Sequence, residues 1–353
     1  MARSVEPDPT TWWERYGHRL SAPPVPAHDG DSAGRVGERT MRRAGPETAA
    51  ELTEDTIVRN RTDRPGEGWR RLVFAGSRGL VNPGPSEAER HRRVRLRRIR
   101  AALAGTHRVA VTSLKGGVGK TTVATGVGLA LAENRGDRAI VLDANPDAGT
   151  LADRLTGETS VTVRELVRDV DRIGSWADVS RYTSLAGRLQ VLASAQDPAS
   201  SDAFSRQEYE QVCALLARFF DIIITDSGTG LVHSAMQGTL ELADSLIVVG
   251  SPTVDGASRA AKTLDWLVAH GYAELAADAV VVLSCDRSSA EVDRGRVWDH
   301  FMARCRAVVA VPHDPHLATG GRVELSRLRR PTHDAFLELA ALIADRFTAD
   351  PDG

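Results

Sequence analysis

The sequence predicts an α/β fold with a mostly parallel, doubly wound sheet, and three observations carry this prediction. From His107 onward, short runs of valine and isoleucine alternate with stretches long enough for helices. Such nearly continuous apolar runs are typical of strands buried on both faces of a parallel sheet. A glycine-rich loop lies between the first strand and the first helix. Residues 1–65 lack sustained hydrophobic periodicity, so we expect a largely disordered N-terminal extension.

The apolar runs set the order of the predicted elements. The strands are expected at 108–112, 139–142, 222–224, 245–249, 279–283 and 307–310. Helices supply the crossovers between parallel strands. We expect one at 121–133 and the last at 333–347. The α/β domain therefore spans 107–348, with a linker at 66–106 before it and a tail at 349–353 after it.

The linker contains a short apolar segment, 68–85, that turn residues close. An arginine-rich helix is expected after it, at Arg90–Arg100. Leu96, Ile99 and Leu103 fall at helical spacing and give this helix one apolar stripe. Its other faces carry arginine. Either it caps the domain as a solvated helix, or it binds a phosphate backbone, an anionic lipid or an acidic protein.

Three aromatic residues, Trp12, Trp13 and Tyr16, stand out in the N-terminal extension. Aromatic side chains dominate the energetics of many interfaces, so this segment is a candidate docking motif for a protein partner. The alternative is that the segment packs back onto the domain.

The bulk composition excludes several classes of protein. The net charge of −2 over 353 residues gives no global attraction to nucleic acid or anionic lipid. Three widely spaced cysteines indicate neither a disulfide framework nor a zinc or iron–sulfur site. We find neither a signal peptide nor an apolar run of the roughly 20 residues that a membrane helix needs. A soluble, cytoplasmic protein is expected.

The most specific motif is the loop Ser113–Thr122, between a predicted strand and a predicted helix. Its glycines let successive backbone N–H groups turn inward around phosphate oxygens. Lys120 would neutralise the β and γ phosphates, and the Thr121 hydroxyl would ligate Mg²⁺. The loop residues expected to bind nucleotide are Lys115, Gly116, Gly117, Val118, Gly119, Lys120, Thr121 and Thr122.

The form Lys-Gly-Gly-Val-Gly-Lys-Thr-Thr, which begins at Lys115, resembles the deviant Walker A motif of the MinD/ParA ATPases. The resemblance covers about residues 107–348 and implies that the nucleotide is ATP. In that family the first lysine reaches across a homodimer to the partner's phosphates. The resemblance therefore implies that Lys115 and Lys120 are catalytic cations and that hydrolysis depends on dimerisation. The physical role is that of an arginine finger.

Two aspartates extend the resemblance. Phe220–Asp226 looks like a Walker B strand, whose last residue, Asp226, would hold a magnesium-bound water. Ser227–Gly230 would be the switch loop that senses the γ phosphate. Asp143 ends the second strand and would support the magnesium and the phosphate loop.

The second strand also contains a departure from the family pattern, which is usually Asp-x-Asp. Asn145 occupies the second position, where the family has the aspartate that orients the attacking water. An amide can position water but cannot accept its proton. Phosphoryl transfer relies mainly on positioning, so Asn145 is compatible with slow turnover, and Asp147 is a candidate substitute.

The residues expected at the adenine end of the site also depart from the family pattern. The family often has an asparagine after the fifth strand that reads the base, whereas this chain has Leu283–Arg287, which contains none. Pro312 and Asp314 follow the last strand and are candidates for packing and base contact. His313 is expected to be an ordinary surface histidine.

These residues favour an ATP-dependent dimerisation switch that positions or assembles a partner. With the Arg-rich helix and the P-loop that follow, Gly-Trp-Arg-Arg and Asn-Pro-Gly-Pro-Ser in the linker resemble the MinD/ParA-like ATPases that accompany actinobacterial type VII (ESX) secretion systems. Two alternatives remain. Asn145 favours a non-hydrolysing nucleotide-bound scaffold, and the Arg90–Arg100 helix favours a DNA-binding partition ATPase. The region Asp334–Gly353 is acidic overall, so we do not expect it to anchor the protein to a membrane.

Overall fold

A computed structural model describes residues 64–145, 149–157, 161–194, 205–229, 234–285 and 292–347. Several predictions fall outside these ranges: those on the aromatic segment Trp12–Tyr16, on Asp147, on Gly230, on Asp286 and Arg287, and on the tail 349–353. The chain divides into two compact units. The described part of the smaller unit is 64–93, and the larger unit contains everything described from Val94 onward.

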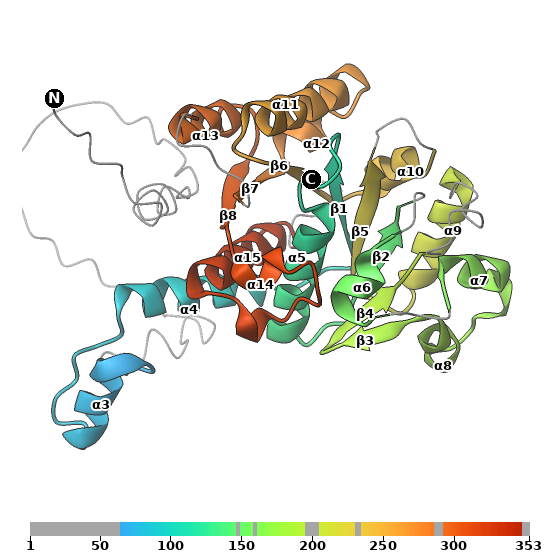
Figure 1. The fold of residues 1–353 in the computed structure, drawn as a ribbon. Helices are drawn as coiled ribbons and strands as arrows, with labels where there is room; N and C mark the ends of the chain where they lie inside the picture. The colour runs from blue at the N-terminus through green and yellow to red at the C-terminus, as the bar shows by residue number, and fades with distance from the viewer. Residues whose placement is uncertain are drawn as a thin grey trace, which may run out of the picture. The chain divides into compact units, whose positions relative to one another are not determined.

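The larger unit is built on one eight-stranded sheet in the order β3-β4-β2-β5-β1-β6-β7-β8 (Figure 1). All neighbouring strands are parallel except β3 and β4. The strands are β1 His107–Ser113, β2 Ala139–Ala144, β3 Ser184–Ala186, β4 Leu189–Leu192, β5 Ile222–Thr229, β6 Ser245–Gly250, β7 Val280–Cys285 and β8 Ala307–Pro312. The parallel α/β architecture predicted from the apolar runs is confirmed.

Helices cover both faces of this sheet. One face packs on α5 Lys120–Asn134 and α15 Arg330–Ala344. The opposite face packs on α11 Val254–Ala269, α12 Ala273–Ala277 and α13 Arg294–Met302 at one end. At the other end of the sheet, this same face packs on α7 Val163–Arg168, α8 Trp176–Val179 and α9 Arg206–Leu216. The remaining helices are α6 Leu151–Leu155, α10 Ser234–Leu242 and α14 Pro315–Ala318, with 3-10 turns at Val170–Arg172, Ser180–Tyr182 and Leu325–Arg327.

Side chains along each strand alternate between these two layers. Val109 and Val111 of β1 belong to the cluster around α5 and α15, whereas Ala110 belongs to the cluster around α11–α13. Because successive side chains of a strand point to opposite faces, a strand covered on both sides must be apolar throughout. This is why the central strands read as continuous runs of valine and isoleucine.

Helix α5 lies very close to α15. A Cβ at Gly126 would stand 2.3 Å from a ring carbon of Phe336, whose side chain is fully buried. The absence of a side chain at Gly126 therefore permits the two helices to meet. The helix that begins at the phosphate loop is thus packed firmly against the last helix of the sheet.

The arginine-rich helix is α4, Glu87–Ile99. Its apolar stripe is confirmed for Leu96 and Ile99, which face the main core. Leu103 also packs against this core, but the helix ends at Ile99, so Leu103 does so from the segment that follows it. Two of its arginines bind carboxylates of the same unit. The ion pairs are Arg95 Nε–Glu338 Oε2 at 2.6 Å, Arg98 Nη1–Glu338 Oε1 at 2.9 Å and Arg98 Nη2–Asp345 Oδ2 at 2.6 Å.

The sequence missed some elements and misplaced others. The apolar segment of the linker contains a helix, α3 Gly68–Gly76. The β3–β4 hairpin and α6–α9 were not predicted individually, because all of them except α9 are only three to six residues long and have no long apolar run. The switch loop was expected to start at Ser227, but β5 continues to Thr229. Pairing of Ala144 with Ser227 and of Ser113 with Thr229 extends the ladder on both sides.

Candidate nucleotide-binding site

The site lies where the parallel strands end. The loop from β1 to α5 follows directly on the central strand of the sheet. Gly117 and Gly119 have φ angles of 72° and 94°, in the left-handed region that side chains other than glycine rarely adopt. Gly119 is the N-cap of α5, so the loop delivers its backbone N–H groups to a helix N-terminus. This arrangement is a ready-made phosphate site.

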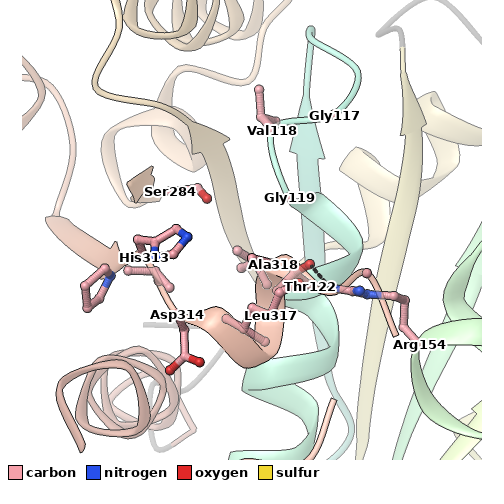
Figure 2. A pocket seen from close by; sticks show the side chains of 14 residues that line it. Gly117, Val118, Gly119, Thr122, Arg154, Ser284, His313, Asp314, Leu317 and Ala318 are labelled. Atoms are coloured by element: carbon pink, nitrogen blue, oxygen red, sulfur yellow. Dashed lines mark hydrogen bonds between the residues drawn. The ribbon is translucent and has the colours of Figure 1, made fainter. Parts of the chain in front are cut away.

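A pocket of about 200 Å³ opens beside this loop (Figure 2). Its wall combines the loop with the ends of β7 and β8 and with α14. The lining residues are Gly117, Val118, Gly119, Thr122, Val123, Arg154, Ser284, Val311, Pro312, His313, Asp314, Leu317, Ala318 and Gly320. The structure therefore brings four of the predicted phosphate residues to the same cavity as the two predicted base residues, Pro312 and Asp314. The four are Gly117, Val118, Gly119 and Thr122, whereas Lys115, Gly116, Lys120 and Thr121 do not line it.

Two carboxylates face each other beside the loop. Asp143 of β2 and Asp226 of β5 are partners in the strand register, and both are almost completely buried. Burial raises the pKa of Asp226 to about 7, and the charge of Asp143 adds to this effect, while Thr121 and Lys120 oppose it. Burial likewise raises the pKa of Asp143 to about 6. The positive charge near these two carboxylates is therefore too small to offset the cost of burying them.

These residues fit a magnesium ion. The Oδ1 atom of Asp226 is buried and has no hydrogen-bond partner in the described part of the chain. Among the described residues, no three or more histidine, cysteine, aspartate or glutamate side chains are grouped so that they could hold a metal ion. Mg²⁺ characteristically takes one or two protein carboxylates and completes its shell with water and phosphate oxygens. Thr121 and Asp226 would hold the ion, with Asp143 behind them.

Asp143 is fixed by backbone and hydroxyl donors. Its Oδ1 accepts from the N–H of Asn145 at 3.1 Å, and its Oδ2 accepts from the N–H of Leu151 at 3.2 Å. The Ser194 hydroxyl also lowers its pKa and accepts from the N–H of Gly149 at 3.0 Å. A Cβ at Gly149 would stand 1.9 Å from Asp143 Oδ2, so only glycine fits. Neither Ser194 nor Gly149 was predicted from the sequence, because each contacts Asp143 or its neighbours only in the folded chain.

Lys120 and Lys115 occupy different environments. Burial lowers the pKa of Lys120, and the charge of Asp226 opposes this. Lys115 instead points to the start of α11, where its Nζ lies 2.6 Å from Asp255 Oδ2. Asp255 also pairs with Arg259 at 3.1 Å. In this single chain, therefore, Lys115 is held by its own subunit.

The end of the pocket formed by α14 is held in place by Asp314. Its Oδ1 accepts from the N–H of His316 at 2.9 Å, and its Oδ2 accepts from the N–H of Arg329 at 2.8 Å. Burial opposes ionisation, but these backbone donors lower the pKa of Asp314 overall. Asp314 thus caps α14 and ties it to the segment before α15. Pro312 lines the wall and the exposed His313 lies at the rim.

A glycine cradle at the carboxyl edge of a parallel sheet, with Lys120 and a buried carboxylate pair beside it, defines a P-loop nucleotide-binding protein. Residues 109–271 match the family described as the CobQ/CobB/MinD/ParA nucleotide binding domain. The P-loop domain of this chain belongs to the MinD/ParA family.

Among curated proteins, the chain is similar to the ESX-1 secretion-associated protein EspI of Mycobacterium tuberculosis, with 33% identity over 285 residues. The match covers 79% of this chain and 42% of EspI, so the chain spans less than half the length of that relative. It is also 27% identical over 166 residues to the septum site-determining protein MinD of Thermotoga maritima, covering 47% of this chain and 60% of that protein.

Solved structures share the fold at low identity. A ParA family ATPase from Chlorobium tepidum aligns with a TM-score of 0.59 at 18% identity, covering 67% of this chain and 98% of that one. MinD of Pyrococcus horikoshii, complexed with Mg-ADP, aligns with a TM-score of 0.54 at 21% identity and covers 67% and 94%. Within the described residues, no helix is long and apolar enough to cross a membrane.

Proposed function

We propose that this protein is an ATP-dependent dimerisation switch that binds Mg-ATP through Lys115–Thr122 and hydrolyses it slowly or on activation by a partner. One observation carries the proposal. The glycine cradle, Lys120 and the Asp143–Asp226 pair lie together at one edge of the sheet, and the carboxylates need a cation to neutralise them.

Each residue has a defined task in this proposal. The backbone N–H groups of the loop bind the β and γ phosphates, and Lys120 neutralises their charge. Bound Mg²⁺ supplies the positive charge that stabilises the phosphates during transfer. Thr121 and Asp226 position that ion, while Asp143 orders the loop after β2. Pro312 and Asp314 shape the wall against the base.

Lys115 supplies the dimer dependence. Its ion pair with Asp255 would be exchanged for the phosphates of the second subunit, so the closed dimer would form only around the triphosphate. Such an exchange is inexpensive because both partners are partly exposed, and exposed ion pairs contribute about 0–1 kcal/mol.

The test is the oligomeric state measured by light scattering after size exclusion, without nucleotide, with Mg-ADP and with Mg-ATP. Wild type should dimerise with Mg-ATP alone, and Lys120→Ala should not bind nucleotide. Lys115→Ala should bind nucleotide and stay monomeric. A wild type that binds ATP but stays monomeric would contradict the role given to Lys115.

The second candidate is a scaffold that binds ATP without turning it over, and Asn145 favours it. The Asn145 backbone N–H supports Asp143, but its side-chain amide cannot accept a proton from water. Phosphate release by wild type and by Asn145→Asp separates the two. Turnover by both variants favours the switch, whereas turnover only after the substitution favours the scaffold.

The partner is proposed to be a secretion-associated protein, because EspI, the relative at 33% identity, is described as associated with ESX-1 secretion. A DNA-binding partition role has less support. Arg95 and Arg98, two of the arginines that it would use, are already paired with Glu338 and Asp345. If DNA binding occurred through the remaining arginines, the affinity would fall steeply with salt.

A further inference from the structure

The strongest unassigned feature of the pocket is Arg154, on α6. Its side chain lines the cavity and the residue is 9% exposed. Nη2 donates to the Thr122 hydroxyl oxygen at 2.8 Å, and Nη1 donates to the Gly321 carbonyl at 3.0 Å. A longer contact joins Nη2 to the Leu317 carbonyl at 3.5 Å. Arg154 therefore connects the phosphate-loop helix with α14 and with the segment that follows it.

The charge of this guanidinium is not neutralised. Across the residues that the structure describes, no carboxylate lies within ion-pair distance of Arg154, and its three acceptors are neutral oxygens. Burial lowers its pKa accordingly. A buried cation with no counter-charge is costly, and such groups are normally paired. An anion that enters the pocket would supply the missing charge.

The position of Arg154 identifies which anion this is. A nucleotide with its β and γ phosphates in the loop Lys115–Lys120 and its base against Pro312 must pass Thr122 and Arg154 between them. The group that joins these two ends is the α phosphate with its ribose. Since the Thr122 oxygen already accepts from Arg154, its hydroxyl proton is free to donate to a phosphate oxygen.

We propose that Arg154 is a nucleotide contact that binds the α phosphate, together with the hydroxyl of Thr122. The inference rests on the proposed ATP site and adds a residue to it. By holding the carbonyls of Leu317 and Gly321, Arg154 also makes the position of α14, at the base end, depend on the same side chain that meets the phosphates.

The test uses titration calorimetry with Mg-ADP and with the Rp and Sp diastereomers of its α-thio analogue. Arg154→Met removes the charge at similar volume, and Arg154→Lys keeps it. Arg322→Met is the matched control, because Arg322 also donates to a nearby backbone carbonyl, that of Thr156 at 2.8 Å, but is exposed and does not line the pocket.

We expect Arg154→Met to weaken Mg-ADP binding roughly tenfold to a hundredfold, as expected for loss of a charged hydrogen bond. The ratio of Rp to Sp affinities should move toward one, and Arg154→Lys should restore part of the loss. Arg322→Met should bind like wild type. A merely structural Arg154 would weaken all ligands equally and leave the diastereomer ratio unchanged, which would overturn the inference.

Two further outcomes separate the alternatives. If Arg154→Met abolished the discrimination between ADP and 2′-deoxy-ADP but kept the thio ratio, the contact would be to ribose and the inference would be wrong. Failure of the wild type to bind Mg-ADP would overturn the proposed function as well. Normal binding by both wild type and Arg154→Met would overturn this inference alone, with Lys120→Ala as the control for the site.

Discussion

At the residue scale, the buried ionisable groups are of two kinds. Some would have their charge neutralised by a bound ligand, and others already have their polar atoms paired within the fold. Asp143 and Asp226 lie together beside the phosphate loop and Arg154 lines the pocket, and burial disfavours the charged form of all three. His107 belongs to the second kind. It is buried at the start of β1, with Nε2 2.9 Å from the Ser245 hydroxyl and its ring against Phe347. These two kinds predict different responses to pH and ligand.

His107 predicts a loss of stability in acid. Burial lowers its pKa to about 4; Asp244 opposes the shift, and Arg108, Arg306 and Arg346 reinforce it. The folded state therefore binds this proton less readily than the unfolded chain. The contribution of His107 to the free energy of unfolding should therefore fall between pH 6.5 and 4, by on the order of 3 kcal/mol, while the raised pKa values of Asp143 and Asp226 act in the opposite direction. Urea titrations of wild type and of His107→Gln across this range should show this contribution as the difference between the two pH profiles. Parallel pH profiles for the two proteins would contradict the prediction.

The Lys115–Asp255 pair predicts an effect on ATP-dependent dimerisation with little effect on the stability of the fold. Asp255→Asn should leave the Tm close to that of wild type, because both side chains are partly exposed and exposed ion pairs contribute little to stability. It should lower the ATP concentration needed for dimerisation, since Lys115 no longer leaves a partner behind. Asp265→Asn removes another exposed ion pair of α11, that with Arg304, and serves as the control in light scattering. An unchanged ATP dependence would show that the pair does not restrain Lys115.

At the element scale, the phosphate loop depends on how α5 is packed. Ten residues of α5, from Val123 to Ala132, are buried, so this helix is surrounded rather than laid on a surface. Close approach to α15 at Gly126 holds it in place. Any shift of α5 moves Thr121 and Lys120 at its first turn.

Gly126→Ala should therefore affect both stability and binding. The added methyl overlaps the Phe336 ring, and overpacking of this kind typically costs about 1–3 kcal/mol. Thermal unfolding should show the loss, and affinity for Mg-ADP should fall with it because α5 is displaced. Gly136→Ala is the control, since a Cβ there meets nothing within 4 Å. A neutral Gly126→Ala would mean that α15 can move aside freely.

At the scale of the whole molecule, ligand binding and folding should be linked. Mg-ADP at about a hundred times its dissociation constant should stabilise the protein by about 2.7 kcal/mol, provided that only the folded state binds it. Differential scanning calorimetry should show a rise in Tm for wild type and none for Lys120→Ala. An equal rise for both proteins would place the ligand elsewhere.

The sheet and the phosphate loop could be predicted from the sequence because each depends on a pattern of consecutive residues. The isoleucine run of β5 and the glycines before Lys120 need no distant partner to be recognised. Arg154, Ser194 and Asp255 could not be found in this way. Each acquires its place from a contact across the fold, such as Arg154 with Gly321 or Lys115 with Asp255.

The order of the chain also bears on its synthesis. Helix α15 follows every strand in the sequence, yet its residues from Ala335 to Ala344 are buried, and they cover α5 and β8. On the ribosome, the helix that carries the phosphate loop thus emerges long before the helix that shelters it. Until then the nascent protein exposes the apolar flank of α5. Competence to bind nucleotide is consequently acquired late in translation, and chains that stop early are left open to chaperones and proteases.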